Sequence, residues 1–195
     1  GEVSQAHGLA EEFLPRSREI RDPQVLVPAL AVVSLIEHSR GNHVTTVRLV
    51  EEVEEVTRDR PVFRARHLPE VLRVCVAAGS IRLAESLLRM EAHPAARYRH
   101  AVLTGRAVLA EAQGRPEEAS ALYEEAAERW VDYGFALEHG QAALGAGRCL
   151  VAVGRHHEAG DHLLEARRTF DALRVRPLLA EADRILAQAE RGTHR

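Results

Sequence analysis

The sequence predicts an all-α fold, a right-handed superhelical array of about four antiparallel helix pairs with one further helix at each end. The first observation is composition, because 46% of the 195 residues are hydrophobic but only 4% are aromatic. The apolar residues are mainly Ala, Leu and Val, and Ala and Leu favour helices. The second observation is that Gly41, Gly79, Gly114 and Gly154 recur at intervals of 38, 35 and 40 residues. Such intervals are close to the length of a two-helix repeat, about 34 residues.

The third observation is the spacing of apolar residues after each of these glycines. They recur every three or four positions, which places them on one face of a helix. The clearest examples are two sets, Ala119, Leu122, Tyr123, Ala126 and Trp130, and Ala159, Leu163, Ala166, Phe170 and Leu173. Charged residues fall largely between these positions, so each segment is expected to have one buried face.

The elements follow in chain order. Residues 3–20 form one amphipathic segment, which resembles the second helix of a pair whose first helix is missing. The chain is therefore expected to be a fragment of a longer protein, with a single domain over residues 1–195. The predicted helix pairs and the final capping helix are 23–58, 62–92, 95–132, 135–174 and 177–190.

Prolines and capping residues support these boundaries. Asp22 precedes Pro23, and an Asp before a Pro is typical of a helix start. Pro28 and Pro69 are each expected to kink a helix or to mark a later start. The alternative for Val25–Ile36 is a buried strand, since Val and Ile favour sheets, but no alternating segment elsewhere would pair with it.

Two segments resemble tetratricopeptide repeats, which have small residues and a turn glycine at set positions. Their matching residues are Ala107, Gly114, Ala119, Tyr123 and Ala126, and then Gly147, Gly154, Ala159, Leu163 and Ala166. The stretch from Glu138 to Ala159, followed by the stretch from Leu173 to Ala189, is similar to the C-terminal repeats of large actinobacterial signalling ATPases. This resemblance implies a cytoplasmic, non-catalytic regulatory module whose ATPase, cyclase or DNA-binding domains lie outside this segment.

The resemblance also implies a concave groove lined by the first helix of each pair. The residues at the groove positions are His38, Arg66, Arg73, Glu111, Gln141 and Arg148. Arg73 and Arg148 take equivalent positions two repeats apart, and arginine binds carboxylates through two parallel hydrogen bonds. We therefore expect an acidic or C-terminal peptide in the groove. The alternative is that these arginines pair with Glu or Asp on neighbouring helices.

Other functions have little support in the sequence. All 26 basic residues are arginine, so the lysine of a phosphate-binding loop is absent. A net charge of −3 without a basic stripe argues against nucleic-acid binding by this segment. The longest apolar run, Val25–Ile36, is too short to cross a membrane. Cys75 and Cys149 lie in apolar stretches and are expected to be buried, reduced thiols. The pair Gly145 and Gly147 is expected to allow close helix packing.

We therefore predict no enzyme activity, no cofactor and no metal, with a protein, a peptide or another domain of the same chain as partner. One alternative is a metal-binding or enzymatic domain using the turn from His156 to His162. In that segment His157 and Asp161, or Glu158 and His162, are four residues apart on a helix. A third possibility is a DNA-associated regulator whose DNA-binding part lies elsewhere. The sequence does not predict the partner or the oligomeric state.

Overall fold

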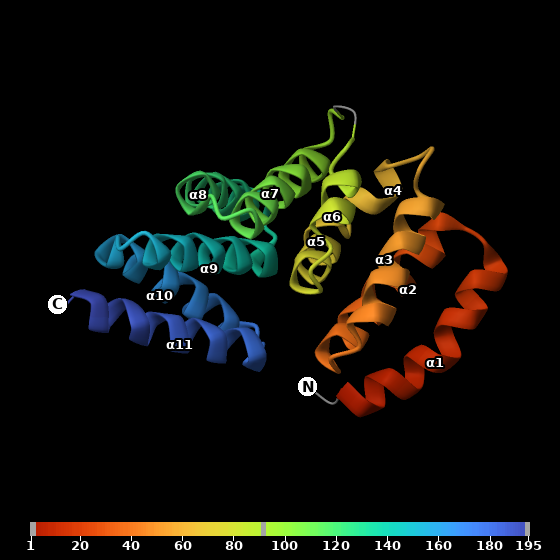
Figure 1. Ribbon diagram of the computed structural model, residues 1–195, viewed down its shortest axis with the longest axis horizontal. Helices are drawn as coiled ribbons and strands as arrows, with labels where there is room; N and C mark the ends of the chain where they lie inside the picture. Colours follow the sequence, from red (N-terminus) through yellow and green to blue (C-terminus); the bar gives the residue numbers. More distant parts are fainter. Residues whose placement is uncertain (1–2, 91–92, 194–195) are drawn as a thin grey trace. The chain divides into compact units, whose positions relative to one another are not determined.

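The computed structural model describes residues 3–90 and 93–193, with side chains from residue 5 onward. The described residues form eleven helices and no strand (Figure 1). The predicted all-α fold is therefore confirmed. The strand alternative for Val25–Ile36 is wrong, because this segment lies within the helix Pro23–Ser39. Its backbone N–H and C=O groups form hydrogen bonds within that helix rather than with a neighbouring strand.

The chain divides into two compact units, and the boundary falls within α7, after Gly105. The N-terminal unit contains seven helical segments in its described part: α1 (Val3–Ile20), α2 (Pro23–Ser39), α3 (His43–Val56), α4 (Val62–Ala65), α5 (Leu68–Ala77), α6 (Ile81–Leu87) and the first part of α7 (Ala96–Ala112). Within this unit α2 packs against α1, α3 and α5, while α5 also packs against α3 and α6. Leu30, Leu68 and Leu72 are fully buried between these helices.

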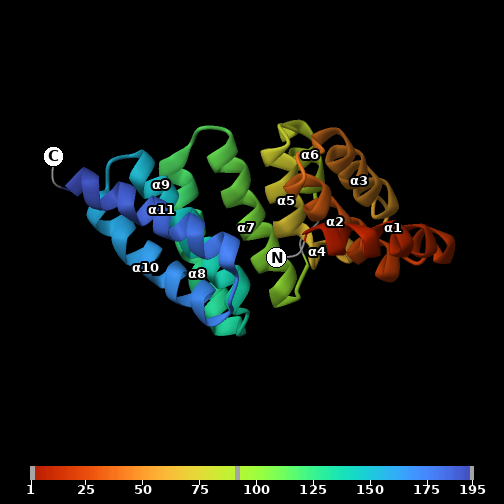
Figure 2. The ribbon, with the colours of Figure 1, turned by 90° about the horizontal axis from the view of Figure 1, so that it is seen from below.

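The C-terminal unit contains the end of α7 and four further helices: α8 (Pro116–Tyr133), α9 (Ala136–Ala152), α10 (His156–Ala172) and α11 (Arg176–Thr193). Each of α8 to α11 packs against its neighbour in the chain, and α9 also packs against α11. Figures 1 and 2 show α9, α10 and α11 side by side. Contacts between a helix and its next two neighbours are the packing expected of stacked helix pairs.

The helix ends follow the predicted turn chemistry. Gly41, Gly79, Gly114 and Gly154 all have φ between +73° and +81°, a conformation that favours glycine. The carboxylate of Asp22 accepts a hydrogen bond of 2.8 Å from the backbone N–H of Gln24, which caps α2.

Pro69 and Pro28 lie at different positions in their helices. Pro69 marks a later start, because the first helix of the predicted pair 62–92 is divided into α4 and α5, with Pro69 in the first turn of α5. Proline is tolerated there because the first turn of a helix needs no N–H donor. Pro28 instead lies inside α2.

Two glycines in α9 allow the close packing that the sequence predicts. A Cβ atom at Gly145 would lie 2.6 Å from the ring of Tyr123 in α8. A Cβ atom at Gly147 would lie 2.5 Å from the side chain of Leu163 in α10. Only glycine lets α9 approach both neighbours this closely.

A buried arginine joins three segments of the N-terminal unit. Arg64 is 4% exposed, and its guanidinium donates to the Leu87 carbonyl at 3.1 Å and to the Thr57 hydroxyl at 3.1 Å. A longer contact of 3.4 Å reaches the carbonyl of Arg89. The Leu87 and Arg89 carbonyls lie at the C-terminal end of α6, where carbonyls lack partners within the helix. Burial lowers the pKa of Arg64, but an arginine side chain stays charged in proteins.

We expect Arg64→Met to lower the free energy of unfolding by about 1–3 kcal/mol, because buried carbonyls lose their donors. The matched control is Arg66→Met, which removes an exposed arginine two residues away and is expected to change stability by no more than about 0.5 kcal/mol. Urea unfolding followed by circular dichroism measures both. Equal effects of the two substitutions would contradict this role for Arg64.

Candidate functional site

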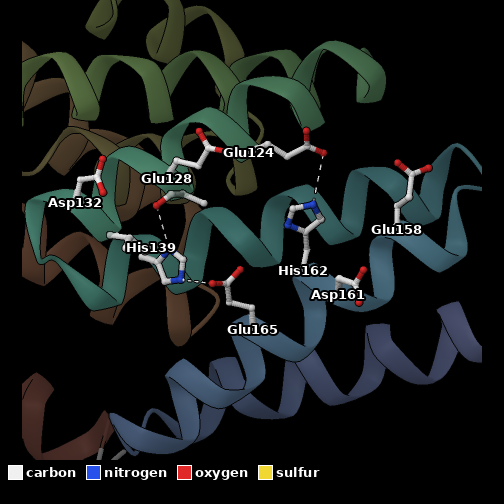
Figure 3. A pocket seen from close by; sticks show the side chains of 10 residues that line it. Glu124, Glu128, Asp132, His139, Glu158, Asp161, His162 and Glu165 are labelled. Carbon is white, nitrogen blue, oxygen red and sulfur yellow. Dashed lines mark hydrogen bonds and ion pairs between the residues drawn. The ribbon is translucent and has the colours of Figure 1, made fainter.

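A groove with a volume of about 750 Å³ lies on the C-terminal unit, between α8 and α10 (Figure 3). Most of its lining is acidic. Its residues are Glu124, Ala127, Glu128, Val131, Asp132, His139, Glu158, Asp161, His162 and Glu165. Below we call this feature the acidic groove.

Helical spacing explains why the carboxylates gather there. On α8, Glu124, Glu128 and Asp132 are each four residues apart, so they form one row along the helix. On α10, Asp161 is three residues after Glu158 and four before Glu165, which gives a second row. The two rows line the same groove, so six carboxylates share it.

Only some of these carboxylates contact a histidine or an arginine. His162 lies 3.6 Å from Glu124 and His139 lies 3.1 Å from Glu165 (Figure 3). Arg155 forms an ion pair with Glu158, and its hydrogen bond lowers the pKa of this carboxyl group. In the described part of the chain, Glu128, Asp132 and Asp161 form no ion pair.

His139 holds one wall of the acidic groove in place. It comes from α9 and is almost fully buried, and its Nδ1 atom lies 3.0 Å from the carbonyl oxygen of Ala127 in α8. Its Nε2 atom contacts Glu165 in α10. One side chain therefore links α8, α9 and α10 beneath the groove.

The predicted alternative of a metal site at His156–His162 gains no support. Among residues 3–90 and 93–193, no three His, Cys, Asp or Glu side chains are grouped so that they could hold a metal ion. The two ends of this segment face different neighbours. His156 packs against Gly192 of α11, whereas His162 pairs with Glu124 of α8.

The structure brings together two of the predicted concave-groove residues, Glu111 and Arg148. Arg148 donates to Glu111 Oε1 at 2.5 Å and to Oε2 at 2.8 Å, and it also contacts Glu181 of α11 at 3.1 Å. The hydroxyl of Tyr123 donates to Glu111 at 2.8 Å. Arg148 therefore pairs with carboxylates on neighbouring helices, as the second of our two hypotheses expected.

The remaining predicted groove residues are placed as follows. Gln141 is half-buried on α9, in the same unit as Glu111 and Arg148. His38, Arg66 and Arg73 belong to the N-terminal unit, where Arg66 is exposed and the other two are half-buried. Burial and the nearby His43 lower the pKa of His38. A single peptide groove over all six residues remains a prediction.

The Glu111–Arg148 pair has electrostatic consequences for stability. Burial alone would raise the pKa of Glu111, but hydrogen bonds from Arg148 and Tyr123 and the charge of Arg148 lower it below the ordinary value of 4.5. Burial likewise opposes the charge of Arg148, but Glu111 raises the pKa of this guanidinium. The charged carboxylate is thus favoured in the folded state.

We expect Glu111→Gln to lower the free energy of unfolding by about 1–3 kcal/mol at pH 7, because a charged hydrogen-bond acceptor is lost. A depressed folded-state pKa stabilises the fold fully above the unfolded-state pKa, and the effect is lost as pH falls through the folded-state pKa. The difference between wild type and variant is therefore expected to shrink below about pH 4.5. Urea unfolding at pH 7 and pH 3.5 measures it. A difference that stays constant between the two pH values would contradict the charge assignment.

The two cysteines match the sequence prediction. Cys75 and Cys149 are free and buried. Burial raises the pKa of each thiol to about 12. Since only the thiolate is nucleophilic, neither cysteine is expected to react with a disulfide reagent such as DTNB in the folded chain at pH 8. Both are expected to react in 6 M guanidinium chloride. Rapid reaction of either thiol without denaturant would show that its environment is open.

Residues 98–172, which span most of α7 and all of α8, α9 and α10, match the tetratricopeptide repeat family. This region is tetratricopeptide-like. The match contains both segments in which the sequence showed the repeat pattern, and it contains the whole acidic groove. No curated protein matches the chain. Within the described residues, no helix of the chain has the length and apolar content needed to span a membrane.

The acidic groove was not predicted from the sequence. The predicted binding surface lies on the first helix of each pair, whereas α8 and α10 are second helices. The available signal was the row of acidic residues at Glu124, Glu128 and Asp132, followed by the row on α10. Each row by itself resembles an ordinary solvated face, and only the packing of α8, α9 and α10 places the two rows along one groove.

Proposed function

We propose that this chain is a non-catalytic, cytoplasmic module that binds a protein partner or another domain of its own polypeptide. In the second case it would regulate a signalling ATPase or transcriptional regulator. The observation that carries the proposal is the match of residues 98–172 to tetratricopeptide repeats, which generally mediate protein–protein interactions. These residues fold as most of α7 and all of α8, α9 and α10, and stacked helix pairs present extended surfaces on which a partner can bind.

Two surfaces of the C-terminal unit are candidates for the partner. The first is the predicted groove surface of α7 and α9, represented by Glu111, Gln141 and Arg148. An acidic peptide would have to compete there with Glu111 and Glu181 for Arg148. The second is the acidic groove, in which three carboxylates form no ion pair with any residue that the structure describes. The second surface therefore needs less rearrangement to bind a charged partner.

Site-specific photo-crosslinking in cells tests the proposed function. The photoreactive amino acid benzoylphenylalanine would replace Gln141 on the first surface, Glu128 in the acidic groove, or Gln188 as an exposed control on α11. We expect one protein, or another part of the same polypeptide, to be crosslinked from position 141 or 128 but not from position 188. Equal products from all three positions, or none from any, would contradict a specific binding surface.

The regulatory part of the proposal has a separate test. The open reading frame upstream of Gly1 is expected to encode a nucleotide-binding ATPase domain if the chain belongs to a signalling ATPase. A start codon immediately before Gly1 would contradict this part, and it would leave a free-standing adaptor as the proposed function.

A further inference from the structure

We infer that the acidic groove between α8 and α10 binds an extended segment of a partner protein that carries Arg or Lys at alternate positions. This inference rests on the proposed function and specifies the chemistry of the partner. It concerns the second helices of the pairs rather than the first.

Two of the residues that line the acidic groove are apolar, Ala127 and Val131. Ala127 is almost fully buried, while Val131 is 53% exposed although it lies among carboxylates. The side chains of Arg and Lys combine an aliphatic stem with a charged end. A stem lying on Val131 would remove apolar surface from water, and the charged end would reach the carboxylates along either wall.

The charge of the acidic groove selects a cationic partner. Six carboxylates line it, and only three of them have an ion pair in the described structure, with His162, His139 and Arg155. Glu128, Asp132 and Asp161 are left to interact with solvent or a partner. A concave surface with one sign of charge attracts the opposite charge and accelerates association.

The spacing of the carboxylates suggests the form of the segment. Residues four apart on a helix are separated by about 6 Å along its axis, so Glu124, Glu128 and Asp132 form a row with this period. In an extended chain, side chains on the same face are two residues apart and lie about 6.6 Å from one another. A segment with cations at every second residue therefore matches the row, whereas a block of adjacent cations would place half of them away from it.

Fluorescence anisotropy with a labelled Arg-Ala-Arg-Ala-Arg-Ala peptide tests the inference. The groove variant carries Glu128→Gln, Asp132→Asn and Asp161→Asn. The control variant carries Glu125→Gln, Asp171→Asn and Glu190→Gln, which neutralise three exposed carboxylates of the same unit outside the groove. All six positions are exposed, so both variants are expected to fold, and their thermal unfolding is measured alongside.

We expect the groove variant to bind the peptide at least about tenfold more weakly than wild type in low salt. The control variant is expected to bind within about twofold of wild type, because its carboxylates lie outside the groove. The peptide Arg-Arg-Arg-Ala-Ala-Ala, which has the same composition, is expected to bind more weakly to wild type. Equal loss of affinity in both variants, equal binding of both peptides, or no binding to wild type would each overturn the inference.

The outcomes separate this inference from the proposed function. If the peptide does not bind but crosslinking from position 141 persists, the chain binds a protein through α7 and α9 and the inference about the acidic groove is wrong. If neither surface captures a partner, the proposed function itself fails.

Discussion

Replacing Trp130 with alanine is expected to lower the free energy of unfolding by about 3–5 kcal/mol, because a large buried side chain is lost and a cavity remains. Trp130 is the only tryptophan of the chain and is 1% exposed. Its ring makes edge contacts with Tyr133 and Phe135, with centroid distances of 5.9 Å and 5.5 Å. These contacts fix the turn between α8 and α9, where Gly134 adopts a φ of +76°.

Urea unfolding followed by circular dichroism measures this loss, since the variant has no tryptophan fluorescence. Val131→Ala is the matched control, because Val131 is adjacent in sequence but 53% exposed. It is expected to cost no more than about 1 kcal/mol. A cost below about 1 kcal/mol for Trp130→Ala would show that the core around α8 and α9 is loosely packed.

The substitution Gly147→Ala is expected to destabilise the chain by about 1–3 kcal/mol through overpacking. The new Cβ would lie 2.5 Å from Cγ of Leu163 and 3.3 Å from the backbone oxygen of Ala159. Leu163 is fully buried and cannot move without disturbing the core it shares with Phe170. The substitution is therefore expected to push α9 and α10 apart at this contact.

The control for this prediction is Gly160→Ala in α10. No atom lies within 4 Å of a Cβ built at Gly160, and alanine is a better helix former than glycine by about 1 kcal/mol. The control is therefore expected to stabilise the chain. Trp130 fluorescence during urea unfolding measures both variants. If both substitutions stabilise the chain, the close approach of α9 and α10 is not required.

Local patterns in the sequence were sufficient to predict most of the fold. Gly41, Gly79, Gly114 and Gly154 were predicted as turns, and each has the positive φ that favours glycine. Apolar periodicity predicted most of the buried positions, and Trp130 and Phe170 are fully buried in the structure as expected. Leu173, which was placed on the same face as Phe170, is instead 43% exposed, because it lies at the end of α10. These features depend on residues close together in sequence, and for that reason periodicity reveals them.

The parts that could not be predicted depend on side chains from different helices. Glu111 and Arg148 are 37 residues apart and were each identified as groove residues, but their pairing with each other needed the packing of α7 against α9. The short helix α4 and the buried Arg64 also have no periodic signal, because Arg64 is held by carbonyls 23 and 25 residues away. Residue spacing along one helix predicts which of its faces is buried. It does not predict which side chains of a neighbouring helix contact that face.

We have proposed that the tetratricopeptide-like region binds its partner on α8 and α10. Nuclear magnetic resonance spectra of the ¹⁵N-labelled chain, recorded during titration with the alternating arginine peptide, test this proposal. We expect the largest amide shift changes at the groove residues between Glu124 and Asp132 on α8 and between Glu158 and Glu165 on α10. Shift changes concentrated instead around Glu111, Gln141 and Arg148 would contradict it.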